Sequence, residues 1–164
     1  MRPCLDAQTV ELLGRSRLMS ELFNAGLEVA LPLRDRGIDL IAFAELRTKV
    51  DQFIACPIQM KAASASSFFV HRKYSRIRNL ILAYVWHVGD PARATTYALT
   101  YREAVRILCR MGFAKTRSWK NAGYGVTRPS RKLLALLEPY KMTSEKWWRL
   151  IMNSSSQFKC ASHG

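Results

Sequence analysis

Two short apolar segments, residues 38–43 and residues 53–60, constrain the fold of this chain more than any other feature. The first is apolar except for Asp39, as expected of a buried strand that shows one acid near its end. A polar stretch, residues 47–52, separates the two and predicts a hairpin between them. The two segments are therefore predicted to form neighbouring antiparallel strands.

A helix is predicted over residues 6–25, with Asp6 as its N-cap and Gly26 as its C-terminal stop. Its apolar stripe is expected to consist of Leu12, Met19, Leu22 and Phe23. Residues 27–33 alternate well enough for a strand, and Pro32 predicts a sheet edge or a strand end there. The order of elements is therefore helix, strand, strand, strand.

Three further elements follow. Residues 80–88 are rich in β-forming side chains, and residues 95–100 predict another strand. Residues 101–111 predict a helix that ends at Gly112. We therefore predict an α/β (α+β) fold, with a central mixed sheet of about five strands flanked by helices.

The chain changes character after Gly112, where cations alternate with aromatic side chains. Residues 123–125 predict a hairpin tip, and residues 130–137 and 143–152 predict two short helices. The expected organisation is a core over residues 1–112, a basic aromatic-containing extension packed on it over residues 113–153, and a flexible tail over residues 154–164.

The charge of the chain is strongly positive. Its 164 residues contain 26 Lys and Arg against 12 Asp and Glu, a formal net charge of +14 at pH 7. This balance favours a polyanionic partner, and a basic binding protein without chemistry is the alternative. The four cysteines form no closely spaced pair, which argues against a zinc knuckle or a disulfide framework. Because no signal pattern or membrane-length apolar run is present, we expect a cytoplasmic protein with no membrane partner.

Asp39 and Lys61 carry the strongest chemical signal in the chain. Hydrolysis of a phosphodiester needs a divalent cation held by oxygen ligands, and Asp39 offers a carboxylate on a buried strand. An ammonium group beside that cation can orient the attacking water and offset developing charge, and Lys61 ends the neighbouring strand. Gln59, two residues earlier, projects on the same sheet face as Lys61, whereas Met60 points the other way.

At these residues the sequence resembles a known family. A helix, then Gly-Ile-Asp-Leu-Ile at residues 37–41, then Ile-Gln-Met-Lys at residues 58–61, is similar to the core of PD-(D/E)xK nucleases. The Gln-x-Lys form resembles Mrr-type restriction endonuclease catalytic domains and Holliday-junction-resolvase-like proteins. The likeness covers approximately residues 7–100. It implies a restriction-endonuclease-like fold, a DNA substrate and a Mg²⁺ (or Mn²⁺) cofactor, and it leaves a homodimer open.

The resemblance also implies roles for individual residues. Asp39 and Gln59 would bind the metal, and Lys61 would serve the attacking water. The first helix of the family often contributes a glutamate, and the corresponding position here is Arg15. Glu11, one turn earlier on the same helix face, is the best substitute and completes the predicted catalytic set, with Glu21 as the next choice.

Cations in several later segments are predicted to contact nucleic acid, together with one tryptophan that can stack on a base. These residues are Lys73, Arg76, Arg78, Arg117, Trp119, Lys120, Arg131 and Lys132. The alternative is that the charges form a solvated face and that the aromatic side chains cover the end of the sheet, with the pair Trp147 and Trp148 in the core or at an interface.

The leading hypothesis from the sequence is a metal-dependent DNA endonuclease of restriction, repair or junction-resolving type. The alternative is a catalytically silent domain of the same fold that binds DNA or a protein partner, and Arg15 at the expected acid position favours it. An RNA-binding structural protein is the third hypothesis, but it would give Asp39 and Lys61 no role.

Overall fold

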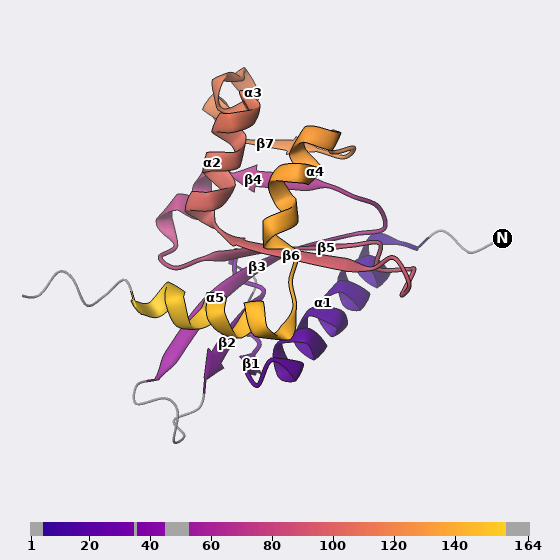
Figure 1. Cartoon of the computed structure of the whole chain (residues 1–164), viewed down its shortest axis with the longest axis vertical. Coiled ribbons are helices and arrows are strands. Elements are labelled where there is room, and N and C mark those ends of the chain that lie inside the picture. The colour runs from indigo at the N-terminus through magenta and orange to yellow at the C-terminus, as the bar shows by residue number, and fades with distance from the viewer. Residues whose placement is uncertain (1–4, 35, 45–52, 157–164) are drawn as a thin grey trace, which may run out of the picture.

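The computed structural model describes residues 5–34, 36–44 and 53–156. Within these residues, a five-stranded sheet in the order β1-β2-β3-β5-β6 forms the centre of the molecule (Figure 1). Its strands are β1 (Glu28–Ala30), β2 (Leu40–Ala44), β3 (Ile54–Ala63), β5 (Ile81–Trp86) and β6 (Thr95–Thr100). Strands β3 and β5 are parallel and the other neighbours are antiparallel, so the predicted mixed sheet is confirmed.

Helices cover both faces of this sheet, which confirms the predicted α/β class (Figure 1). One face packs against α1 (Ala7–Asn24) and α5 (Ser144–Ser156). The other packs against α2 (Tyr101–Met111), α4 (Arg131–Leu137) and a two-stranded sheet made of β4 (Phe68–His71) and β7 (Gly123–Val126). The remaining elements are η1 (Arg72–Arg76), η2 (Phe113–Lys115), α3 (Arg117–Asn121) and η3 (Glu138–Tyr140). No helix in the described ranges is long and apolar enough to span a membrane.

Helix α1 begins and ends as predicted. The Asp6 carboxylate accepts a hydrogen bond from the Thr9 amide at 2.7 Å, and Gly26 adopts a left-handed backbone with φ of 78°. The predicted apolar stripe is partly wrong, because Leu12 is 68% exposed and Phe23 is 48% exposed. The buried positions are Gly14, Leu18 and Leu22, spaced four residues apart along the helix.

Gly14 explains why the stripe was misjudged. A Cβ atom at this position would lie 2.4 Å from the Cβ of Ala62 on β3, so the helix backbone rests directly on the sheet. Close packing therefore selects a residue without a side chain, whereas hydropathy counts only large apolar ones. This contact sets α1 against β3, the strand that carries Gln59 and Lys61.

Two strand predictions need correction at their ends. Strand β1 is shorter than the predicted 27–33 strand, and Leu31 and Leu33 are exposed. It is an edge strand, as Pro32 indicated. Strand β3 continues to Ala63 because β5 supplies hydrogen-bonding partners along that length. The predicted hairpin at residues 47–52 lies outside the described residues.

The segment from β6 to the end of α2 agrees with the prediction residue by residue. Thr100 caps α2 through a capping box with Glu103, and Gly112 ends the helix in a left-handed conformation. The predicted helices at residues 130–137 and 143–152 are present as α4, capped by Ser130, and α5. Helix α5 continues to Ser156, three residues into the segment expected as tail.

The predicted hairpin tip at residues 123–125 is wrong. These residues belong to β7, which pairs with β4 in antiparallel register, with Val70 opposite Tyr124. Pairing between segments so far apart in the chain leaves no local sequence signal. Gly123 allows the close approach, because a Cβ there would lie 2.5 Å from the Val70 carbonyl oxygen. The Phe69 ring fills the space where a Cβ of Gly125 would stand.

Candidate active site

Asp39 lies immediately before β2 and is fixed to the backbone of β3. The register pairs Leu40 with Ile58, which places Asp39 opposite Gln59. The Asp39 amide donates to the Ile58 carbonyl at 2.9 Å, and the Met60 amide donates to Asp39 Oδ2 at 2.7 Å. The carboxylate is therefore held at the junction of the two strands, as the order of elements predicted.

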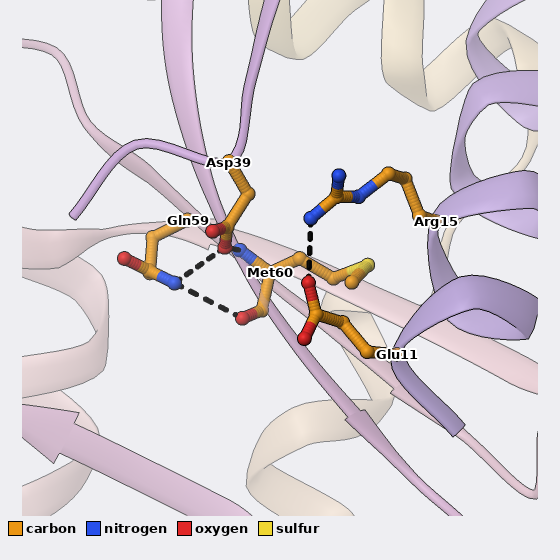
Figure 2. A network of polar contacts seen from close by, with 5 residues as sticks. All are labelled: Glu11, Arg15, Asp39, Gln59 and Met60. Atoms are coloured by element: carbon orange, nitrogen blue, oxygen red, sulfur yellow. Dashed lines mark hydrogen bonds and ion pairs between the residues drawn. The ribbon is translucent and has the colours of Figure 1, made fainter. Parts of the chain in front are cut away.

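The Gln59 side chain is buried beside this carboxylate (Figure 2). Its Nε2 donates to Asp39 Oδ2 and also to the Met60 carbonyl oxygen, the latter at 3.1 Å. The amide nitrogen therefore occupies a point that touches one carboxylate oxygen and one carbonyl oxygen. Hard divalent cations prefer such oxygens as ligands, so this point fits a Mg²⁺-type ion in the chemistry of its donors.

The orientation of the Gln59 amide is the feature that sequence reasoning missed. Its nitrogen faces Asp39, whereas its Oε1 lies near Gly37, 3.9 Å from where a Cβ of that glycine would stand. An amide in this orientation takes the electropositive role between the two oxygens. The predicted ligand atom, Oε1, would face a cation only after the amide turns over about its terminal torsion.

Lys61 lies on β3 two residues after Gln59, on the same face of the sheet. Its Nζ is 5.8 Å from the centre of the Tyr74 ring, and Lys73 Nζ is 5.4 Å from the same ring. Tyr74 is buried and comes from η1, so two ammonium groups from different elements lie beside the same ring. A lone tyrosine inside the basic run was the available sequence signal for this arrangement.

Glu11 and Arg15 extend from α1 toward the Asp39 end of the site (Figure 2). Arg15 Nη2 donates to Glu11 Oε1 at 2.6 Å, so the predicted substitute acid is paired with the arginine at the family's acid position. Both side chains are partly solvent-accessible, which keeps this i,i+4 pair weak. A guanidinium group therefore approaches the site from the helix, together with the carboxylate.

Glu21, the next choice after Glu11 for the missing acid, makes hydrogen bonds that join α1 to other elements of the fold. Its Oε1 accepts a hydrogen bond from Thr96 Oγ1 at 2.8 Å, and its Oε2 accepts one from Trp147 Nε1 at 3.2 Å. It also pairs with Arg17 at 3.0 Å. Glu21 thus joins α1 to β6 and α5. Across the described part of the chain, no group of three or more His, Cys, Asp or Glu side chains is placed to hold a metal ion.

Two of the segments predicted to contact nucleic acid, η1 and α3, lie side by side. The Arg72 amide donates to the Ala122 carbonyl at 2.8 Å, and Arg72 Nη1 donates to the Lys120 carbonyl at 2.6 Å, so η1 adjoins α3. Six of the predicted cations are exposed: Arg76, Arg78, Arg117, Lys120, Arg131 and Lys132. Lys73 is exposed as well and lies over Tyr74.

The aromatic residues differ in their surroundings. Trp119 is half-buried and packs against the core on the α2 side of the sheet. Trp147 is fully buried in the core on the α1 side, and Trp148 packs against that core. This confirms the core interpretation for the tryptophan pair.

Comparison with known proteins leaves the chain without a family. No family model matches it, and no curated protein matches it. Among solved structures, it is similar to the bacterial homing endonuclease I-Ssp6803I, at 13% sequence identity and a TM-score of 0.49, over 94% of this chain and 97% of that one.

Proposed function

We propose that this protein is a metal-dependent DNA endonuclease of restriction, repair or junction-resolving type, with Asp39, Gln59 and Lys61 at its active centre. One observation carries the proposal. The Gln59 amide nitrogen sits between Asp39 Oδ2 and the Met60 carbonyl oxygen, a point where a cation would find two oxygen ligands.

Asp39, the Met60 carbonyl and a turned-over Gln59 amide are the residues that would hold Mg²⁺ or Mn²⁺. A divalent cation bound there would polarise a phosphoryl oxygen and lower the pKa of the attacking water. Asp39 is kept in place by the Met60 amide, so it needs no rearrangement to act as a ligand. For Oε1 to become a ligand, the Gln59 side chain must withdraw so that the cation takes the place of Nε2, and its amide must turn over about the last torsion, which is broad and roughly two-fold.

Lys61 would act on the phosphate and the water. Its ammonium can orient the nucleophile and offset the charge that develops as one P–O bond forms and the bond to a sugar oxygen breaks. The products are a phosphate monoester and a sugar hydroxyl, which takes up a proton. The Tyr74 ring restrains the lysine without neutralising its charge.

The substrate class follows from charge. A formal charge of +14 favours a polyanion, and Lys73, Arg76 and Arg78 lie on or next to η1, whose Tyr74 contacts Lys61. These side chains are proposed to hold the DNA backbone across the site. A homodimer would allow both strands to be cut, and sedimentation analysis would test it.

The proposal is tested by incubating the protein with supercoiled plasmid and with branched DNA in Mg²⁺ or Mn²⁺. Asp39→Asn and Lys61→Met keep the size of each side chain and should each reduce nicking about a hundredfold or more. Arg93→Ala removes an exposed charge at the far end of β5 and β6 and should nick like the wild type. Undiminished nicking by both site variants would refute the assignment.

A catalytically silent DNA-binding domain is the second candidate. Two features favour it: a cation, Arg15, stands at the position of the helix acid, and Gln59 directs an amide N–H at the carboxylate that would hold a metal. This candidate predicts that no DNA substrate is cleaved in Mg²⁺ or in Mn²⁺, although the protein still binds DNA in EDTA.

A further inference from the structure

A cleft of about 690 Å³ opens at the end of the sheet where β5 begins and β6 ends. Three arginines line it: Arg78 before β5, and Arg102 and Arg106 on α2. Asn79 and Asn153 add two amides. All three arginines are exposed, so the cleft is an open, strongly basic surface.

One acid, Glu103, also lines the cleft, but its carboxylate is engaged. Glu103 Oε2 accepts hydrogen bonds from the amide and the hydroxyl of Thr100, both at 2.8 Å. The first turn of α2 is therefore already capped from within the chain. A ligand in the cleft would meet guanidinium groups and side-chain amides, the donors that suit a phosphate group, rather than the helix end.

The cleft adjoins the proposed active centre through Ile77. This side chain lines the cleft, and its Cδ1 lies 3.9 Å from the position that a Cβ of Gly37 would take. Gln59 Oε1 lies 3.9 Å from the same position. The Ile77 side chain and the Gln59 amide therefore lie beside the same residue, Gly37.

We propose that this cleft binds a backbone phosphate of the DNA strand that is cut at Asp39, with Arg78, Arg102 and Arg106 as the phosphate-binding residues. The inference rests on the proposed endonuclease function and adds a second contact on the same strand. It assigns a role to two arginines of α2 that no sequence motif singled out. Planar guanidinium groups can pair with two phosphate oxygens at once, which fixes the strand in register.

Asn79 provides an independent test of the cleft. Its backbone is left-handed, with φ of 54°, in the turn between η1 and β5. Asparagine tolerates this conformation and glycine adopts it freely. Asn79→Gly therefore removes the amide from the cleft without straining the turn, whereas Asn79→Ala would strain it.

The experiment measures equilibrium binding of a labelled DNA duplex by fluorescence anisotropy in EDTA, at several salt concentrations. Arg102→Ala combined with Arg106→Ala should weaken binding about tenfold per arginine and reduce the salt slope by about two. Asn79→Gly should weaken it about threefold to tenfold, as expected for one lost hydrogen bond to a charged group. Arg93→Ala is the control for charge alone, and thermal melting of each variant checks folding.

A second arm separates the DNA backbone from a small phosphate ligand. A mononucleotide such as adenosine 5′-monophosphate should not displace the duplex at micromolar concentration. Displacement, or cleft variants that bind DNA as tightly as Arg93→Ala, would overturn the proposal. If the double alanine variant unfolds, a double lysine variant, with Arg102→Lys and Arg106→Lys, takes its place. This variant keeps both charges but loses the planar guanidinium groups, so it should bind DNA more weakly than the wild type. Wild-type affinity in that pair would equally overturn it.

The failure of the two proposals can be told apart. Asp39→Asn removes a negative charge beside the bound strand, so it should bind the duplex at least as tightly as the wild type and fail to nick it. If wild type binds through the cleft but cleaves no substrate, the endonuclease proposal fails and the phosphate contact stands.

Discussion

Replacing Gln59 by glutamate tests whether the point between Asp39 and Met60 is built for a cation. In the wild type, the amide nitrogen donates to Asp39 Oδ2 and to the Met60 carbonyl oxygen. Gln59→Glu puts a carboxylate oxygen against these two acceptors at a buried position. Without metal, one oxygen of the introduced carboxylate faces the negative charge of Asp39 and the Met60 carbonyl oxygen.

The size of this destabilisation is limited because the introduced carboxyl can take up a proton instead of staying charged. Burial and the neighbouring carboxylate raise the pKa of the introduced carboxyl above its ordinary value of about 4.3. The destabilisation is therefore present at neutral pH and is lost as pH falls. It cannot exceed the cost of protonating the group, which is 1.36 kcal/mol per pH unit, or about 4 kcal/mol at pH 7 and about 1 kcal/mol at pH 5. The protonated carboxyl can again donate to Asp39.

Gln59→Leu is the matched control, because it loses both hydrogen bonds and adds no charge. It should lower the free energy of unfolding by about 2 kcal/mol at both pH values. Mn²⁺ at a hundred times its dissociation constant should restore about 2.7 kcal/mol to the glutamate variant, and less to the leucine variant. Urea unfolding of both variants and the wild type at pH 5 and pH 7, in EDTA and in Mn²⁺, measures these differences in the free energy of unfolding.

Two results would refute this reasoning. A glutamate variant as stable as the wild type at pH 7 in EDTA would show that Asp39 and Met60 do not crowd the introduced carboxylate. Equal responses of the two variants to Mn²⁺ would show that the metal does not bind at this point.

Three further predictions concern the scaffold. Gly14→Ala should lower the free energy of unfolding by about 1–3 kcal/mol, because the added methyl group would meet Ala62. Adding Ala62→Gly should recover part of that loss. A double variant as unstable as the single one would disprove this contact. Glu21→Gln should cost about 1–3 kcal/mol in urea unfolding because the carboxylate accepts hydrogen bonds from β6 and α5, and an unchanged midpoint would speak against that role. Burial raises the pKa of Tyr84 well above 10, so stability should decline as pH rises past 10, where the unfolded phenol ionises. Tyr84→Phe should flatten that decline and cost about 1 kcal/mol at neutral pH through the lost bond to the Phe69 carbonyl, whereas parallel pH profiles would contradict it.

Much of the fold can be predicted from local sequence signals. The segment from β6 to the end of α2 was predictable because its capping box and its terminal glycine lie within the segment itself. The pairing of β4 with β7 was not, because it joins short segments that lie more than fifty residues apart in the chain. Gly14 was missed for a different reason: its contribution is a close approach, which hydropathy does not register.

In the candidate site, too, some features could be predicted from the sequence and others depend on tertiary contacts. Adjacent antiparallel strands fix which residues stand opposite each other, so the sequence placed Asp39 beside Gln59 correctly. The direction of the Gln59 amide depends on hydrogen bonds to Asp39 and the Met60 carbonyl that only the assembled strands reveal. The basic cleft joins a loop before β5 to one face of α2, and charge counting along the chain cannot bring those two together.

The most direct test of the proposed centre is a crystal soaked in Mn²⁺ and measured at the manganese absorption edge. We predict an anomalous peak about 2.1 Å from a carboxylate oxygen of Asp39 and from the Met60 carbonyl oxygen, with the Gln59 side chain withdrawn from this point and its Oε1 facing the ion. A saturating soak with no peak at this point, and with Gln59 still donating to Asp39, would contradict the proposal.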